Sequence, residues 1–168
     1  HEMIAEYLRD MKTEVQVLRA LGVEAAFQSE MAQRAEINLK IGTAKDDIER
    51  EKLKHLNRRH LRKARKLTPL LKYRGAEKAV ELSRMAMQIH GGSGYTMEYG
   101  AEKLLRDSLV LPIYEGTTQI QSLMATKDTL LQITKNPQGL VKGAAEARWR
   151  SLSARDPLER KVAKIQAL

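Results

Sequence analysis

The first forty residues carry one long pattern of apolar and small side chains. These recur at alternating steps of four and three, at Ile4, Leu8, Met11, Val15, Leu18, Gly22 and Ala25. Such spacing places them on one face of an α-helix. We expect this helix to run from near Ile4 to about Leu39 or Ile41, which restricts the fold to one built on long helices.

A second long helix follows after a short turn. Gly42 fits the C-terminal cap of the first helix, and Asp46 followed by Glu49 fits a capping box that starts the next one. The two helices should therefore form an antiparallel hairpin. The apolar face of the second helix comprises Leu53, Leu56, His60, Ala64, Leu67 and Leu71. Thr68-Pro69 predicts either the start of a new helix or a kink in a continuous one.

Helical spacing continues from Ala76 to Ile89 and stops at the glycines 91–94. We expect a shorter helix from about Tyr99 to Leu109, another from Thr118 to about Thr134, and one or two weaker helices after Pro137. Aromatic residues make up only 4% of the chain, and strong helix formers dominate. The predicted fold is all-α, an up-and-down bundle of long antiparallel helices over residues 1–135, followed by a helical, truncated C-terminal extension over 136–168.

Composition sets further limits on the chain. It has no cysteine, which excludes disulfides, thiolate nucleophiles and sulfur-ligated zinc and mildly favours a reducing compartment. No apolar run approaches the ~20 residues of a membrane span, and the N-terminus lacks a signal pattern. We expect a soluble intracellular protein without membrane insertion. The chain begins at His1 and ends at Leu168 in mid-pattern, which indicates a piece of a larger protein.

Positive charge is concentrated in one segment. The formal net charge is +9, and residues 50–74 contain eleven basic residues against the single acid Glu51. The simplest interpretation is a solvated helix face, or one matched by an acidic surface elsewhere in the protein. Attraction to the phosphates of a bound nucleotide is a second interpretation. A nucleic-acid interface is a third, although only Tyr73 interleaves with the charges.

Two local features carry candidate chemistry. Glu115 lies on a short glycine loop between Pro112 and an apolar-striped helix, where it could serve as a general base or simply as a charge near a helix N-terminus. The segment 88–95 could be a helix end with a tight turn, or glycines that let backbone amides approach a ligand. Within it, we expect His90 to be packed or hydrogen-bonded rather than catalytic.

Both features match a known family at an ordered spacing. The first motif consists of Gln88, Gly91, Gly92, Gly94, Tyr95, Glu98, Lys103 and Asp107. The second is Pro112-Ile113-Tyr114-Glu115-Gly116-Thr117, with Thr118-Gln119-Ile120-Gln121 after it. Together they resemble the C-terminal signature of the acyl-CoA dehydrogenase family. The similarity is sharp over about residues 68–130, and residues beyond about Lys135 have no recognised match.

The resemblance implies roles for individual residues. Glu115 would remove the α-proton of an acyl-CoA thioester while hydride leaves the β-carbon for FAD, which yields a trans-2-enoyl-CoA. Its backbone amide would help to polarise the thioester carbonyl. The remaining implied contacts are Tyr114 and Gly116 with substrate, Thr117 and Gln119 with the flavin cofactor, and Gln88, Gly91 and Gly92 with the FAD of a neighbouring subunit. No metal is implied.

The resemblance also implies partners and alternatives. We expect a homo-oligomer, dimer or tetramer, with FAD shared between subunits, an electron acceptor such as an electron-transfer flavoprotein, and a cytoplasmic or, in a eukaryote, mitochondrial matrix location. Other domains of the family supply most of the cofactor pocket, so this piece should be inactive alone. Two alternatives stay open, a DNA-binding alkylation-response-type flavoprotein domain using the basic helix 50–74, and a purely structural tetramerisation module.

Overall fold

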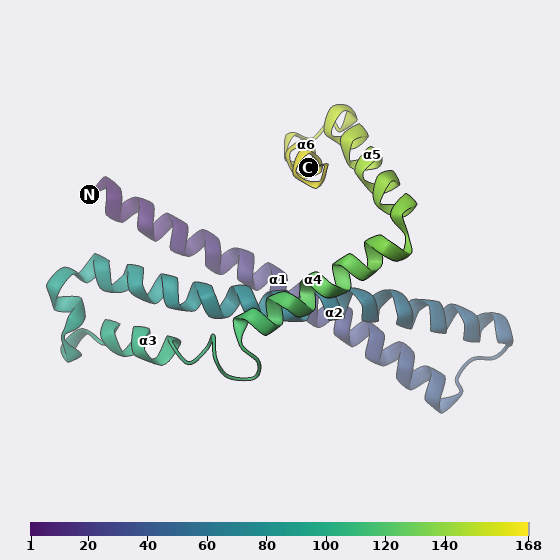
Figure 1. The fold of residues 1–168 in the computed structure, drawn as a ribbon, viewed down its shortest axis with the longest axis horizontal. Helices are drawn as coiled ribbons and strands as arrows, with labels where there is room; N and C mark the ends of the chain where they lie inside the picture. The colour runs from purple at the N-terminus through teal and green to yellow at the C-terminus, as the bar shows by residue number, and fades with distance from the viewer. Residues whose placement is uncertain (168) are drawn as a thin grey trace. The chain divides into compact units, whose positions relative to one another are not determined.

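The computed structural model describes residues 1–167 and is helical throughout its regular segments (Figure 1). Two compact units divide the chain, His1–Thr126 and a second that starts at Lys127. The predicted all-α class and the pairing of long antiparallel helices are confirmed. Within the described residues, no helix combines the length and apolar character needed to cross a membrane.

The first unit is built on a hairpin of two long helices. Helix α1 spans Glu2–Ile41 and packs antiparallel along α2, which spans Asp47–His90 (Figure 1). The predicted caps form: Gly42 adopts a left-handed φ of 75°, and the Asp46 side chain accepts from the Glu49 N–H at 2.6 Å. Glu49 in turn accepts from the Lys45 N–H at 2.8 Å, one residue earlier than in a standard capping box.

Helix α2 continues through Pro69, which settles the alternatives at Thr68-Pro69 in favour of one continuous helix. A proline inside a helix removes a backbone donor and crowds the preceding turn. Pro69 is nevertheless buried, so tertiary packing holds the helix together across this point.

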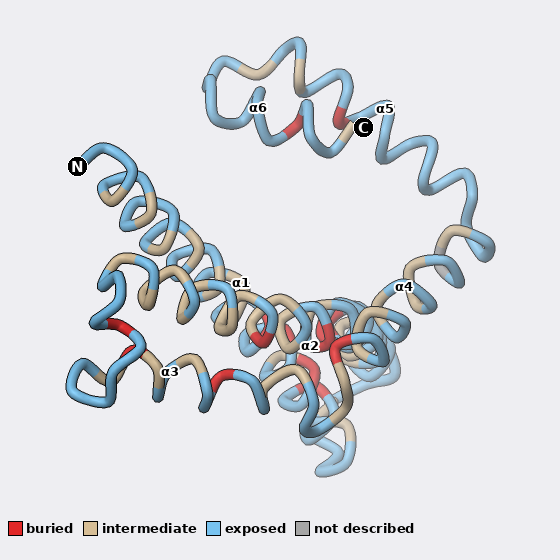
Figure 2. Tube along the Cα trace, turned by 60° about the vertical axis from the view of Figure 1, so that its left-hand side comes forward, coloured by how far each residue is buried: buried red, intermediate tan, exposed pale blue. Residues whose placement is uncertain are grey.

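The residues buried in α1 and α2 are small or polar, and Figure 2 draws all buried residues in red. The buried residues of these helices are Ala25, Gln28, Ala32, Ala35, His60, Ala64, Pro69 and Ala76. Among the described residues, no large side chain is fully buried. Alanine permits the two helix backbones to approach closely, whereas large apolar residues such as Val23 (71% exposed) and Phe27 (51%) remain at the surface.

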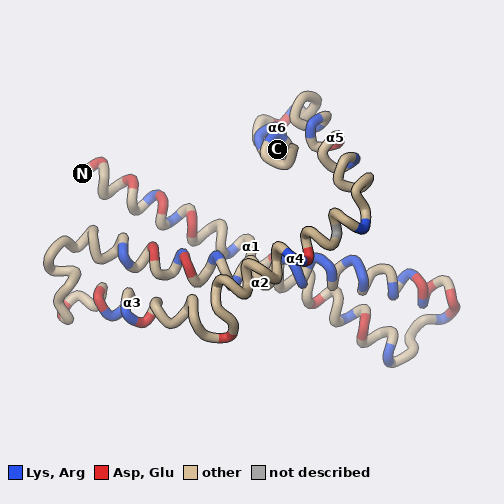
Figure 3. Tube along the Cα trace, viewed as in Figure 1, with Lys and Arg blue, Asp and Glu red and all other residues tan. Residues whose placement is uncertain are grey.

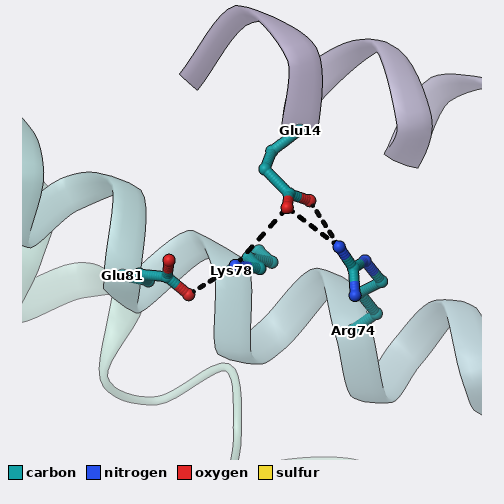
Figure 4. A network of polar contacts seen from close by, with 4 residues as sticks. All are labelled: Glu14, Arg74, Lys78 and Glu81. Atoms are coloured by element: carbon teal, nitrogen blue, oxygen red, sulfur yellow. Dashed lines mark hydrogen bonds and ion pairs between the residues drawn. The ribbon is translucent and has the colours of Figure 1, made fainter. Parts of the chain in front are cut away.

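Polar contacts between α1 and α2 fix how the two helices align along their length. Glu14 of α1 receives both hydrogen bonds from Arg74 of α2, at 2.8 and 2.9 Å, and lies 3.5 Å from Lys78 (Figure 4). Lys78 also pairs with Glu81 at 2.7 Å. Near the other end of the hairpin, Asn57 donates to the Ala32 carbonyl at 2.8 Å.

Shorter elements complete the first unit. Two 3-10 turns, η1 (Gly91–Tyr95) and η2 (Met97–Tyr99), reverse the chain after α2, and α3 (Ala101–Ser108) packs back against α2. Helix α4 (Thr118–Lys135) begins in this unit, and the boundary between the units falls inside it.

The second unit contains α5 (Pro137–Ser153) and α6 (Pro157–Gln166), which pack together. Its buried residues are again small, Ala147 and Ala163. Arg150 of α5 lies 3.5 Å from the side-chain oxygen of Gln166 in α6. The expectation of one or two helices after Pro137 therefore corresponds to two.

Candidate functional site

The loop that carries Glu115 has an unusual backbone. Glu115 has a φ of 53°, and it is the only non-glycine residue with a positive φ among the described residues. The left-handed region costs an ordinary L-residue roughly 1–2 kcal/mol. Such strain persists only where surrounding structure imposes it, and it is concentrated at functional sites.

Helix α4 fixes the second half of this loop. The side-chain amide of Gln121 donates to the Glu115 carbonyl at 3.1 Å, and the Thr117 hydroxyl accepts from the Ile120 N–H at 3.4 Å. Gly116 has a φ of 92°, and a Cβ there would lie 2.7 Å from the Gln121 nitrogen. The positive φ therefore favours glycine at 116, and a side chain there would also displace the Gln121 amide from its present position.

Lys72 of α2 fixes the first half. Its ammonium donates to the Leu111 carbonyl at 2.8 Å and lies 3.8 Å from the centroid of the Tyr114 ring. In the sequence, Lys72 is distinguished only as a member of the basic segment. No local pattern could have revealed this contact, because Leu111 follows Lys72 by 39 residues.

The carboxylate and the backbone N–H of Glu115 are unpartnered among the described residues. The Glu115 carboxylate is exposed and has no hydrogen-bond or ion-pair partner among the described residues, and the Glu115 N–H donates to none of them. Ile113 is 66% exposed, so the apolar side chains next to Glu115 in sequence do not bury the carboxylate within this chain. Tyr114 is 44% exposed, and Gln119 is exposed in the first turn of α4.

The glycine turn forms a second group at the end of α2. Gly91 has a φ of 61° and donates to the Gln88 carbonyl, while the Gln88 side chain is exposed. Gly92 has no positive φ, and a Cβ there would meet nothing within 4 Å. Neither conformation nor packing in this chain therefore requires glycine at 92. Gly94 differs, because a Cβ there would lie 2.5 Å from the Met87 carbonyl oxygen.

Two histidines have structural partners. His90 Nδ1 lies 2.8 Å from the Ala86 carbonyl, in agreement with the expected hydrogen-bonded histidine. His60 is buried against α1, so it belongs to the packed face of α2 rather than to its basic surface. No three His, Asp or Glu residues in the described part of the chain gather as a metal site.

The predicted site residues fall into two separate groups. The Glu115 loop contacts α2 at Lys72, and the glycine turn begins beside Gln88 at the end of the same helix. The sixteen residues from Lys72 to Gln88 span about 24 Å along an α-helix. Within one chain, Glu115, Tyr114, Gly116, Thr117 and Gln119 therefore lie together, whereas Gln88, Gly91 and Gly92 lie at the far end of the helix.

The basic segment lies along the first half of α2 (Figure 3). Within it, Lys54 pairs with Glu51 at 2.6 Å, and Arg74 pairs with Glu14 at 2.8 Å. Arg58 and Arg62 are exposed, one turn apart on the helix. This surface is distinct from the Glu115 loop except at Lys72.

Comparisons with known proteins agree on one family. Residues 1–130 match the model of the acyl-CoA dehydrogenase C-terminal domain. The chain is 43% identical over 68 residues to the 3-(aryl)acrylate reductase of Clostridium sporogenes, covering 40% of this chain and 18% of that protein.

Two further relatives come from other bacteria. The 3-methylmercaptopropionyl-CoA dehydrogenase of Ruegeria pomeroyi is 50% identical over 56 residues, 33% of this chain and 10% of that protein. The CarC subunit of the caffeyl-CoA reductase-Etf complex of Acetobacterium woodii is 43% identical over 61 residues, 36% of this chain and 16% of that protein. The matched parts are thus less than a fifth of each relative.

No solved structure matches the chain significantly. The assignment rests on the family model, which covers most of the chain, and on relatives that are themselves dehydrogenases and reductases. We conclude that this chain belongs to the acyl-CoA dehydrogenase family and carries its C-terminal domain in residues 1–130.

Proposed function

We propose that this chain is the C-terminal domain of an FAD-dependent enzyme that desaturates an acyl-CoA thioester to a trans-2-enoyl-CoA, with Glu115 as the base for the α-proton. The observation that carries the proposal is the left-handed backbone of Glu115, the single strained non-glycine residue among those described. Its side chain and amide both remain free for a ligand.

The loop offers the two functions that α-proton removal needs. A carboxylate is an effective base toward a weakly acidic carbon only if the neighbouring carbonyl is polarised and water is excluded. The Glu115 N–H can donate to the thioester oxygen, and the exposed Tyr114 and the half-buried Gly116 can flank the acyl group. Ile113 and Tyr114 can close over the carboxylate only when substrate and the rest of the protein cover them.

The residues present fit FAD. Thr117 and Gln119 lie at the N-terminus of α4, where backbone N–H groups suit a phosphate or another electron-rich group. Gly92 leaves open space that a Cβ would fill, beside the exposed Gln88 and Gly91. FAD would supply the hydride acceptor. The interval of about 24 Å along α2 supports two different cofactor contacts from one chain, the Glu115 loop on one FAD and the glycine turn on a neighbour's.

Names of the relatives include both dehydrogenases and reductases. Removal and delivery of the α-proton are the same step in opposite directions, so Glu115 serves either one. We place this chain with the dehydrogenases. One relative is a subunit of a complex with an electron-transfer flavoprotein, which supports such a flavoprotein as the electron acceptor here. A cytoplasmic location, or the mitochondrial matrix in a eukaryote, stays a prediction.

We further propose a homo-oligomer and inactivity of the chain alone. Large apolar residues remain at the surface of the hairpin and of α4, among them Leu8, Val23, Phe27, Ile120 and Leu123. Exposed apolar stripes of this extent indicate surfaces covered by other chains or domains. Packing in a dimer or tetramer would cover these residues. If Glu115 proves dispensable for activity, a purely structural role in that assembly is the conclusion.

The test uses the full-length protein that contains this chain. Glu115→Gln keeps the size of the side chain and removes the base, so exchange of the substrate α-proton with D2O should fall by about 10²-fold or more. Flavin absorbance should be unchanged. Glu77→Gln is the matched control, an exposed carboxylate on α2, and should exchange as wild type does. Wild-type exchange in Glu115→Gln would overturn the proposal.

The exposed basic surface of α2 favours one second candidate, binding of DNA phosphates (Figure 3). Such binding weakens steeply with salt, in proportion to the number of neutralised phosphates. If it occurs, duplex affinity should drop in Arg58→Gln/Arg62→Gln with a shallower salt dependence. No duplex binding at physiological salt would exclude this candidate.

A further inference from the structure

Lys72, in the basic segment 50–74, contacts the loop that carries Glu115. Its ammonium makes two contacts with this loop. One contact is the hydrogen bond to the Leu111 carbonyl, and the other is the face of the Tyr114 ring. Both are attractive for a cation, since a carbonyl oxygen and an aromatic face are electron-rich.

These contacts lie on either side of a tight turn. The Ile113 and Tyr114 N–H groups both donate to the Val110 carbonyl, at 3.0 and 3.2 Å. Lys72 therefore joins the start and the end of this turn to α2. Tyr114 directly precedes Glu115, so the position of its ring restricts the backbone from which the carboxylate extends.

Lys72 is placed by the packed hairpin. Lys72 is half-buried in the interior of a 44-residue helix, and Pro69, within one turn of it, is buried. Arg74, two residues later, donates from one guanidinium nitrogen to both carboxylate oxygens of Glu14 in α1. The loop is thus held to α2 of the hairpin through Lys72 at one end and to α4 through Gln121 at the other.

We propose that Lys72 is a positioning residue for Glu115, which holds the base in its reactive geometry through Leu111 and Tyr114 without contacting substrate. This inference rests on the proposed role of Glu115. A misplacement of about 1 Å in a catalytic group can reduce the rate by about 10²-fold. Loss of Lys72 should therefore act on the chemical step.

The experiment measures α-proton exchange per bound flavin in the full-length protein. Lys72→Met keeps the aliphatic stem and removes the donor and the charge. We expect exchange to fall by about tenfold to a hundredfold, with kcat reduced by a larger factor than KM is raised, and with flavin occupancy unchanged. Lys72→Arg, which still donates and stacks on an aromatic ring, should recover most of the loss. Lys12→Met, an exposed lysine of α1, is the matched control and should behave as wild type.

A second variant tests the route through the ring. Tyr114→Leu removes the aromatic face, together with the phenol hydroxyl, from a residue that is already 44% exposed, so it should fold even if Lys72→Met does not. If both residues act through one contact, the double variant loses less than the product of the two single losses. Multiplicative losses would overturn the role of Tyr114 as intermediary.

Failure of this inference is distinguishable from failure of the proposed function. Wild-type exchange in Lys72→Met, combined with abolished exchange in Glu115→Gln, overturns the positioning role alone. Wild-type exchange in Glu115→Gln overturns both. A loss in Lys72→Met that only follows lost flavin, with normal exchange per remaining flavin, shows a structural role and likewise overturns the inference.

Discussion

Gln28 of α1 and His60 of α2 share a buried hydrogen bond of 2.6 Å between Oε1 and Nδ1. The Gln28 amide nitrogen donates to Glu24 at 2.7 Å, so its oxygen is the acceptor and His60 Nδ1 carries the proton. The ring of Phe27 meets the His60 ring edge-on, with centroids 6.1 Å apart. This pair fixes the tautomer of His60 and the register of the hairpin.

Gln28→Leu should therefore destabilise the protein. It leaves the His60 N–H unpaired at a buried site, which costs about 1–3 kcal/mol in free energy of unfolding. Thermal unfolding of the full-length protein should show a lower midpoint. Gln16→Leu, at an exposed position of α1, is the control, and an equal midpoint in both variants would contradict the expectation.

Glu14→Gln should remove an acid-sensitive part of the stability. The hydrogen bonds from Arg74, together with its charge and that of Lys78, hold the pKa of Glu14 below its ordinary value of 4.5. A carboxyl with a lowered pKa in the folded state stabilises the fold above its unfolded pKa and loses that contribution as pH falls through the folded pKa. Glu14→Gln should thus melt below wild type at pH 7, with the gap closing in acid.

Glu36 provides the comparison for Glu14. It forms an exposed i,i+4 pair with Lys40 in α1, a kind of contact that contributes little to stability. Glu36→Gln should melt within error of wild type across the same pH range. A gap for Glu14→Gln that persists unchanged at pH 2 would show that the ion pair is not its source.

Gly94→Ala and Gly92→Ala should separate packing from ligand contact in the glycine turn. A methyl group at 94 would collide with the Met87 carbonyl and the His90 Cβ, which lie 2.5 and 2.9 Å from its position, so we expect a clear fall in melting temperature. Gly92→Ala meets open space and should fold normally. If Gly92 contacts FAD, its variant should still lose flavin affinity, measured by equilibrium dialysis.

Glu115→Val and Glu115→Asn both remove the base but differ in backbone tolerance. Asparagine accepts a left-handed φ more readily than other non-glycine residues, whereas a β-branched residue resists it. At the φ of 53° we expect Val to be less stable than Asn by about 1 kcal/mol or more. Calorimetry on the two variants checks this, and equal stability would mean that the loop relaxes.

Local chemistry explains why much of the fold could be predicted. The caps at Gly42 and Asp46 depend on a few neighbouring residues, so the hairpin turn could be read from the sequence. Apolar spacing predicted α1 and the packed face of α2, including His60. The continuity of α2 through Pro69 depends on tertiary packing and could not be decided from Thr68-Pro69.

The candidate site was predictable only in part, for a physical reason. Motif spacing identified Glu115 and the glycine turn. It did not show that Gly116 lies beside the side chain of Gln121. The contact of Lys72 with Leu111 and Tyr114, and the left-handed φ of Glu115, arise when the chain closes on itself. No property of the neighbouring residues in sequence encodes them.

The uninterrupted course of α2 limits how sequences of this kind can change in length. Each residue inserted between Lys72 and Gln88 lengthens the interval by about 1.5 Å and turns the glycine end by about 100°. Only an insertion or deletion of about seven residues, two helical turns, would point the glycine turn to the same side of α2 again. It would still shift that turn by about 10 Å along the helix. Single insertions or deletions here should therefore be far less tolerated than in the turn between α1 and α2.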